Sequence, residues 1–289
     1  MKPAPFEYRR PGTLAEAVAA LAGAPDAKVL AGGQSLVPLL SMRLASPAVL
    51  VDINAIPDLD AIVANDAGEA AEGGDGGVRV GALARHAAVL ASPEVRRVQP
   101  LVPMALQHVA HATIRNRGTT VGSIVHADAA AEMPVVLTLL GGSVDVEGPA
   151  GRRTIPADEL YVGPLESSLA HDEIAVSAYV PALAPGAGVA FDEIARRHGD
   201  YALVGAAALV QGESVRVGYL SVGDVPTVVD LSGVADDDLG EAALAHLDPP
   251  DDIHASAAYR AQLVRVLTTR VVRSAREHAR QQQPSREDA

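Results

Sequence analysis

Two glycine-containing segments interrupt otherwise apolar sequence, and the first of them is "KVLAGGQS" at residues 28–35. Because glycine has no Cβ, a ligand can approach the N–H groups of Gly32 and Gly33, and a positive φ is allowed there. Ser35 stands just before the next apolar run, where its side chain can cap a helix whose first amides favour a phosphate. The segment therefore predicts a phosphate-binding turn, with a plain strand–turn–helix connection as the alternative.

The second segment, residues 113–134, reads "TIRNRGTTVGSIVHADAAAEMP". Small residues and hydroxyls stand where a strand would carry bulky side chains, namely Gly118, Thr119, Thr120, Gly122 and Ser123. Hydroxyls and free amides together can bind a phosphate or a ribityl chain. Asp128 and Glu132 follow, and a carboxylate is the group expected on a sugar hydroxyl. The alternative is a glycine turn with two solvated acids.

Other groups of polar residues give weaker signals. His108, His111 and His126 lack an acidic partner at a recognised ligand spacing, so the sequence predicts no metal site. The run "ARRHGDY" at 195–201 favours a solvated hairpin turn. The common nucleotide-binding fingerprints, G-x-G-x-x-G and G-x-x-x-x-G-K-[ST], do not occur. Spacing identifies no Ser-His-Asp arrangement either, and no residue is predicted to be catalytic.

The composition excludes several classes of function. The chain has no cysteine among its 289 residues, which removes disulfides, cysteine nucleophiles and the usual ligands of iron–sulfur clusters. Its formal net charge of -13 argues against a nucleic-acid partner, which would need clustered Lys and Arg. No apolar run reaches the roughly 18 residues of a membrane helix, and the first residues lack the apolar stretch of a signal peptide. We therefore expect a soluble, cytoplasmic protein without a membrane span.

The elements that would position the first segment form a β-α-β-like unit. Thr13 followed by Glu16 three positions later predicts a capping-box helix over 13–24. Only 3% of the residues are aromatic, so the core must be built from Ala, Val and Leu. The next predicted elements are a strand, a helix and a second strand, at 27–33, 35–45 and 48–53.

The remaining elements change in character along the chain. Two strands of a hairpin with an exposed tip are predicted at 59–66 and 77–84, and helices at 82–92 and 98–110. Short strands follow within 141–156 and 173–181, and three runs with the spacing of an antiparallel meander lie at 189–197, 202–212 and 215–223. Helices close the chain before a frayed tail at 282–289. The sequence thus predicts an α/β front half and a β-then-α back half that starts near residue 178.

Five motifs, in this order, resemble the FAD-binding medium subunit of molybdenum hydroxylases, the family of bacterial carbon monoxide dehydrogenase, xanthine dehydrogenase and aromatic hydroxylases. They cover nearly the whole chain: "FEYRRPGTLAEAVAAL", "LAGGQSLVPLLSMRLASPAVLVDI", "IRNRGTTVGSIVHADAAAEMP", "FDEIARRHGDYALVGAAA" and "DIHASAAYRAQLVRVLTTR". The resemblance implies an α+β fold with a FAD-binding domain at 1–177, divided into a small β-α-β subdomain at about 1–54 and a mixed or antiparallel sheet subdomain at 55–177. A C-terminal domain at 178–289 would carry a three-stranded antiparallel sheet packed with helices.

By this resemblance, two segments bind FAD. The first comprises Lys28, Val29, Leu30, Ala31, Gly32, Gly33, Gln34 and Ser35, and its glycines let the pyrophosphate rest on backbone amides. The second comprises Gly118, Thr119, Thr120, Val121, Gly122 and Ser123. Further flavin contacts fall at Val109, Glu132 and Ala175, with the Glu132 carboxylate at the sugar chain. We expect non-covalent FAD, because the chain has no cysteine and there is no histidine at 31–35 or at 118–123.

Two residues depart from the family pattern. Val121 stands where the family usually has a glycine, and valine tolerates a positive φ poorly. If the family glycine serves close approach of the cofactor, Val121→Gly should tighten FAD binding. Glu193 stands near a position often occupied by Lys and would bring a negative charge near the flavin.

The resemblance implies a subunit that passes electrons rather than activating a substrate. A large partner would hold a molybdopterin centre and a small partner two [2Fe-2S] clusters, in a dimer of heterotrimers. FAD on this chain would deliver the electrons to an external acceptor such as NAD, a quinone or oxygen. Two alternatives remain: a flavin-poor scaffold subunit of such a complex, and a free-standing small flavoenzyme.

Overall fold

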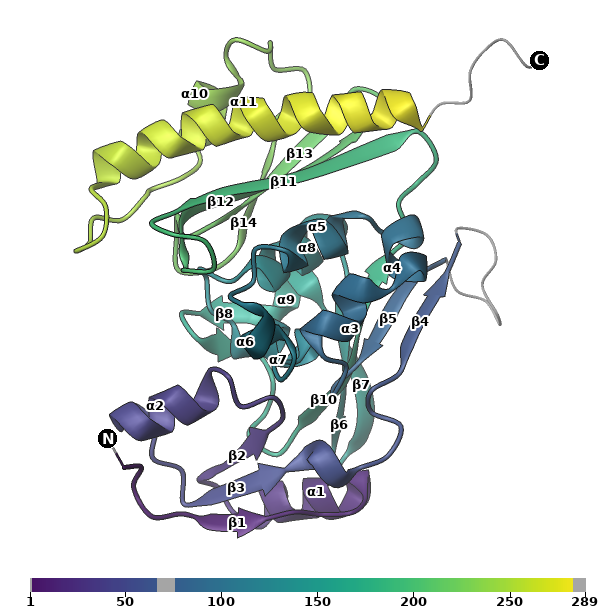
Figure 1. Ribbon diagram of the computed structural model, residues 1–289, viewed down its shortest axis with the longest axis vertical. Helices are drawn as coiled ribbons and strands as arrows, with labels where there is room; N and C mark the ends of the chain where they lie inside the picture. The colour runs from purple at the N-terminus through teal and green to yellow at the C-terminus, as the bar shows by residue number, and fades with distance from the viewer. Residues whose placement is uncertain (1, 67–75, 283–289) are drawn as a thin grey trace.

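Three main sheets follow one another along the longest axis of the molecule, as Figure 1 shows for this computed structural model. The structure describes residues 2–66 and 76–282. A small sheet lies at one end, a larger sheet covered by short helices lies in the middle, and the third sheet lies at the other end under a long helix. The α+β class predicted from the sequence is confirmed.

The small sheet is parallel throughout, with strand order β1-β3-β2. Its elements are β1 (Glu7–Arg9), α1 (Leu14–Ala22), β2 (Ala27–Leu30), α2 (Leu36–Met42) and β3 (Val49–Asp52), with a short 3-10 helix at Ile53–Ala55. Because β2 and β3 run in the same direction, their carboxyl ends share one edge of the sheet. The β-α-β unit predicted from the sequence is therefore confirmed.

The start of α1 carries the predicted capping box. The Thr13 hydroxyl oxygen accepts a hydrogen bond from the Glu16 amide at 3.2 Å, and the Glu16 carboxylate accepts one from the Thr13 amide at 3.1 Å. This reciprocal pair satisfies two amides that the helix itself leaves without partners. Local sequence alone therefore fixes where this helix begins.

The middle sheet is antiparallel, with strand order β4-β5-β10-β6-β7. Its strands are β4 (Ile62–Asn65), β5 (Gly77–Gly81), β6 (Ser143–Gly148), β7 (Gly151–Pro156) and β10 (Ile174–Pro181). The hairpin of β4 and β5 is confirmed, whereas most of its predicted exposed tip lies outside the described residues. The domain boundary after residue 177 stays a prediction, and that residue lies within β10.

Short helices cover one face of the middle sheet (Figure 1). They are α3 (His86–Ala91), α4 (Pro93–Val98), α5 (Leu101–Leu106), α6 (Ala112–Arg115), α7 (Thr120–His126) and α8 (Glu132–Leu140). After β7 come α9 (Ala157–Leu160) and a small hairpin of β8 (Tyr161–Gly163) and β9 (Glu166–Ser167). The two helices predicted at 82–92 and 98–110 are present as the shorter α3 and α5.

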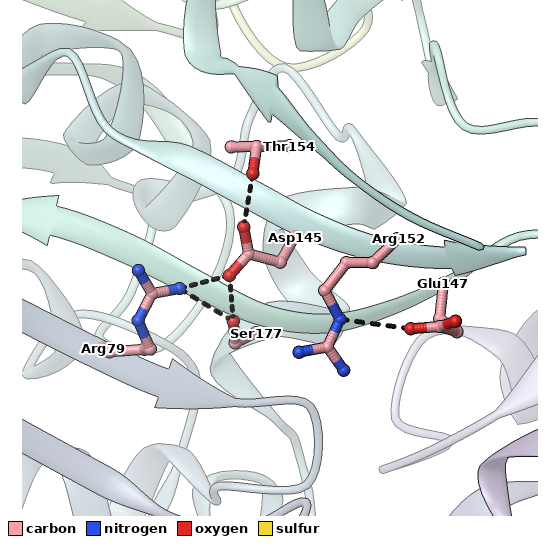
Figure 2. A network of polar contacts seen from close by, with 6 residues as sticks. All are labelled: Arg79, Asp145, Glu147, Arg152, Thr154 and Ser177. Atoms are coloured by element: carbon pink, nitrogen blue, oxygen red, sulfur yellow. Dashed lines mark hydrogen bonds and ion pairs between the residues drawn. The ribbon is translucent and has the colours of Figure 1, made fainter.

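The other face of the middle sheet is polar. Val144 and Val146 of β6 are buried, and the alternating Asp145 and Glu147 point to the opposite side. Figure 2 shows Asp145 between Arg79, Thr154 and Ser177, with Glu147 paired to Arg152. This arrangement keeps the face that lacks a helical cover hydrophilic.

The third sheet has strand order β11-β12-β13-β14 and is antiparallel. Its strands are β11 (Ala187–Ala195), β12 (Ala202–Gln211), β13 (Ser214–Leu220) and β14 (Thr227–Asp230), and its helices are α10 (Leu239–Leu244) and α11 (Ala257–Gln281). The sequence predicted three strands here, and β14 is a fourth that it missed. The apolar face of α11 buries Leu263, Leu267 and Val271 against this sheet.

Candidate functional site

The two glycine-containing segments lie against each other. Gly32 is buried, and a Cβ at this position would lie 2.4 Å from the carbonyl oxygen of Arg117 and 2.8 Å from Cα of Gly118. Only a glycine lets two backbones approach this closely. The sequence predicted that the missing side chain of Gly32 leaves room for a ligand, but the second segment fills that room. The two segments therefore form one continuous surface.

The first segment turns at Gly33 and leaves its amides unpaired. Gly33 has a φ of +72°, in the left-handed region that glycine adopts without strain. Within the described part of the chain, the N–H groups of Gly32, Gly33, Gln34 and Ser35 donate no hydrogen bond. Ser35 precedes α2 without a side-chain cap bond, so its predicted role as a helix cap is wrong. Four successive free donors fit an anionic group such as a pyrophosphate.

Residues 119–123 of the second segment form the start of helix α7. The Thr119 hydroxyl oxygen caps α7 by accepting from the Gly122 amide at 3.2 Å. The Thr120 hydroxyl lies 3.2 Å from Nδ1 of His86. Burial, with the nearby positive charge of Arg115, lowers the pKa of His86 to about 4, so this ring is neutral at pH 7. Both threonine side chains are buried and support the segment from inside the protein.

Val121 does not have the backbone conformation that the sequence suggested for it. It lies in the first turn of α7, outside the residues with positive φ, and its side chain is only 1% exposed. It packs with Ile124 and Met133 into the main core, which lies between the middle sheet and the short helices that cover it. The valine is therefore a core residue, and no strain arises from its replacing a glycine.

A hydrogen-bond network that the sequence did not reveal joins the two segments. The Asn54 side-chain amide donates to the carbonyl oxygen of Ala31 at 2.8 Å, and its oxygen accepts from Arg85 at 2.7 Å. The other terminal nitrogen of Arg85 donates to the carbonyl oxygen of Arg117 at 2.6 Å. Two polar side chains thus connect backbone next to Gly32 with backbone next to Gly118.

Asp52 anchors this network from the end of β3. Its carboxylate accepts from the Asn54 backbone amide at 2.9 Å, from the Asn54 side-chain amide at 2.6 Å and from the Tyr8 hydroxyl. Burial alone would raise the pKa of Asp52, but the hydrogen bonds from Tyr8 and Asn54 outweigh it and hold that pKa below its usual value. Asp52 and Asn54 could have been suspected from the sequence, because they directly follow a strand parallel to the one that leads into Gly32.

Glu132, the predicted sugar contact, belongs to a buried acidic pair. Its exposed fraction is 9%, and the Glu193 side chain, from the C-terminal domain, is 5% exposed. Burial and the charge of Glu193 raise the pKa of Glu132 to about 8. One oxygen of Glu193 lies 3.4 Å from Nδ1 of His108, and the other is buried without a hydrogen-bond partner. Glu132 is therefore mostly protonated at pH 7.

His108 completes this cluster through its contact with Glu193. The hydrogen bond with Glu193 raises its pKa, although partial burial acts in the opposite direction. Its ring also packs against Phe191 of β11, with the ring centroids 5.1 Å apart. His108 is therefore a link between the two domains rather than the metal ligand considered from the sequence.

The other predicted site residues are placed as follows. The carbonyl oxygen of Val109 accepts from Arg115 at 2.8 Å, just before the second segment. Lys28 is exposed on β2. Burial lowers the pKa of His126, and the charge of Lys28 lowers it further. Ala175 is buried in the main core on β10. The structure thus joins the two segments but brings no described contact between Ala175 and either of them.

The run 195–201 is a hairpin turn, as the sequence favoured. Asp200 pairs with Arg196 at 3.0 Å and with Arg197 at 3.5 Å. His198 stacks on His111 with the centroids 6.1 Å apart, so the turn packs against the residues just before the second segment. Across the described ranges, no group of three or more His, Cys, Asp or Glu residues could hold a metal ion. Among those same residues, no helix has the length and apolar character needed to cross a bilayer.

Comparisons with known proteins agree with this geometry. A family model described as "FAD binding domain in molybdopterin dehydrogenase" matches residues 4–183, and "CO dehydrogenase flavoprotein C-terminal domain" matches residues 189–275. The 6-hydroxypseudooxynicotine dehydrogenase complex subunit alpha of Paenarthrobacter nicotinovorans is 41% identical over 97% of each chain. The carbon monoxide dehydrogenase medium chain of Hydrogenophaga pseudoflava is 33% identical, over 95% of this chain and 98% of its own length. The solved quinoline 2-oxidoreductase of Pseudomonas putida 86 aligns with a TM-score of 0.86 at 36% identity, covering 96% of this chain and 99% of the matched one.

Proposed function

Because the chain belongs to the family of FAD-binding medium subunits of the carbon monoxide and xanthine dehydrogenase type, we propose that it carries electrons between the other subunits of a molybdenum hydroxylase and an external acceptor. FAD, when bound, supplies the capacity to take up electrons and pass them on. The residues of this chain hold and orient that group. No residue of the chain is assigned a chemical step on the substrate.

The contact between the two glycine-containing segments is the observation that carries this proposal. Free amides at 32–35 face no acceptor among the described residues, and Gly32 joins them to the backbone at 117–119. We assign the pyrophosphate to the amides of the first segment and further contacts to the second, Gly118 to Ser123. Glu132, Val109 and Ala175 complete the proposed set, with Glu132 at the sugar chain.

We place the remaining redox centres on partner subunits. The chain has no cysteine to ligate an iron–sulfur cluster. Its relatives bear the names of different substrates, 6-hydroxypseudooxynicotine, carbon monoxide and quinoline, although the flavin subunits are similar in sequence. This supports a molybdopterin-binding large subunit that selects the substrate and a small subunit with two [2Fe-2S] clusters. The proposed assembly is a dimer of heterotrimers in the cytoplasm.

The test is a titration of the purified full chain with FAD, followed by precipitation with acid. We expect one FAD to bind per chain and to be recovered in the acid supernatant, because the site offers hydrogen bonds and no cysteine. Flavin that stays with the pellet would contradict a non-covalent site. A chain that binds no FAD, but still co-purifies with the partner subunits, would support the scaffold alternative.

A further inference from the structure

Arg85 is placed where it can reach both glycine-containing segments. It lies between β5 and α3, and its backbone forms an isolated bridge with Thr119. Hydrogen bonds also join the residues on either side of Arg85 to the second segment. The His86 amide donates to the carbonyl oxygen of Gly118, and the Thr120 amide donates to the carbonyl oxygen of Ala84. The side chain of Arg85 then extends to the carbonyl oxygen of Arg117 and to Asn54. One residue is thus fixed to the second segment and directed at the first.

The orientation of the Asn54 amide follows from its surroundings. Its nitrogen faces two good acceptors, the carbonyl oxygen of Ala31 at 2.8 Å and the Asp52 carboxylate at 2.6 Å, while its oxygen faces the Arg85 guanidinium at 2.7 Å. The reversed amide would place a donor against a donor and an acceptor against acceptors. Asn54 is therefore a rigid link that holds Ala31 on one side and Arg85 on the other.

We propose that Asn54 and Arg85 act as one unit of positioning residues that sets the separation of the two segments and thereby the affinity for FAD. This inference rests on the proposed function. Both terminal nitrogens of Arg85 are engaged with protein oxygens, so its part is to bridge the segments rather than to present a free charge. Bridging needs a planar fork with two donors, which lysine lacks although it keeps the charge.

The test compares FAD binding by the full chain and by three single variants. Arg85→Lys keeps the charge and removes the fork. Asn54→Asp keeps an acceptor for Arg85, removes the donor to Ala31 and to Asp52, and sets a second carboxylate beside that of Asp52. Arg79→Lys is the matched control, because Arg79 also bonds two oxygens, on Asp145 and Ser177, on the polar face of the middle sheet (Figure 2). FAD affinity and dissociation rate are measured by flavin fluorescence, and thermal unfolding of each apo protein shows that it is folded.

We expect Arg85→Lys and Asn54→Asp each to weaken FAD binding at least tenfold through faster dissociation, with Arg79→Lys within twofold of the wild type. The double variant Asn54→Asp/Arg85→Lys should lose less than the product of the two single losses, because either change alone opens the bridge. A general loss of stability does not produce this non-additivity. If Asn54→Asp does not fold, the FAD affinity of Arg85→Lys compared with that of Arg79→Lys tests the proposal.

Two results would overturn the inference. One is an Arg85→Lys variant that binds FAD within twofold of the wild type, which would show that charge alone suffices. The other is a double variant whose loss equals the product of the single losses. A wild-type chain that binds no FAD is a different result, since it removes the proposed function together with the inference that rests on it.

Discussion

Gly32 shows how one missing side chain can bring distant parts of a chain together. The carbonyl oxygen of Arg117 occupies the position that a Cβ at residue 32 would need. Gly33 contributes differently, through its positive φ, and the two adjacent glycines therefore have separate reasons to be glycine. The sequence signals the pair as a ligand-binding turn, but it does not signal the contact with the second segment.

The variant Gly32→Ala should separate the two segments. The added methyl group would lie 2.4 Å from the Arg117 carbonyl oxygen, so one backbone must move. We expect FAD affinity to fall at least tenfold, which corresponds to about 1.4 kcal/mol, together with a lower unfolding midpoint of the apo protein. Gly223→Ala is the control, because a Cβ there meets only ordinary contacts at 3.8 Å. Equal FAD affinity in Gly32→Ala and the wild type would show that the close contact is unimportant for the cofactor.

Glu132 makes the stability of the apo protein depend on pH. A glutamic acid in the unfolded chain titrates near 4.5, and burial beside Glu193 raises the pKa of Glu132 in the folded chain to about 8. Between these pH values the folded state keeps a proton that the unfolded state has released. The contribution of this group to stability is therefore present below about pH 4.5 and is lost as the pH rises to 8.

The variant Glu132→Gln removes this titration. We expect it to be more stable than the wild type at pH 8, by an amount on the order of 2 kcal/mol, and similar to it near pH 5. The measurement is chemical unfolding of the apo protein at both pH values, with Glu213→Gln in the exposed β12–β13 turn as the control. A wild-type advantage at pH 8 would mean that Glu132 is ionised and well paired in the folded state.

At the scale of elements, α7 and the edge shared by β2 and β3 position the site. The parallel pairing of β2 with β3 places Ala31 beside Asn54, and residues 117–119, just before α7, lie against Gly32. The sequence predicted the strands but did not predict α7, because glycine and threonine have low helix propensity. Burial of Val121 and Ile124 against the core overrides that local preference.

The variant Val121→Gly tests this reading of α7. Removing a buried side chain and placing glycine in a helix should cost about 2–3 kcal/mol of stability. We expect no gain in FAD affinity, contrary to the tighter binding suggested by the sequence. Thermal unfolding of the apo form and FAD titration measure the two effects separately, and Val121→Ala isolates the loss of packing. Tighter FAD binding with unchanged stability would show that the valine obstructs the cofactor.

How far the sequence could predict this site depends on the range of each interaction. The capping box at Thr13, the β4–β5 hairpin and the β11–β13 meander depend on neighbouring residues, and all of them were predicted. β14, Thr227–Asp230, was missed. The bridge from Asn54 to Arg85 and the pairing of Glu132 with Glu193 join residues far apart in the chain, so only the folded structure reveals them.

At the scale of the whole molecule, the C-terminal domain lies on the side of the short helices opposite the small sheet. Glu193 and Phe191 of β11 contact His108, and the turn after β11 stacks His198 on His111. Figure 1 shows this domain above α5 and α8, with the first segment on the far side of the short helices. The acidic pair therefore lies where the two domains meet.

We propose this chain as the FAD-carrying member of a larger redox complex. The most direct test of this proposal is the absorption spectrum, cofactor content and mass of the complex purified from the native host through a tag on this chain. We predict one FAD per copy of the chain, two [2Fe-2S] clusters and one molybdenum on co-purifying subunits, and a mass that fits a dimer of heterotrimers. A complex with molybdenum and iron but no flavin would contradict the proposal that this chain carries FAD. A flavin-loaded chain without partners would contradict its place in a complex.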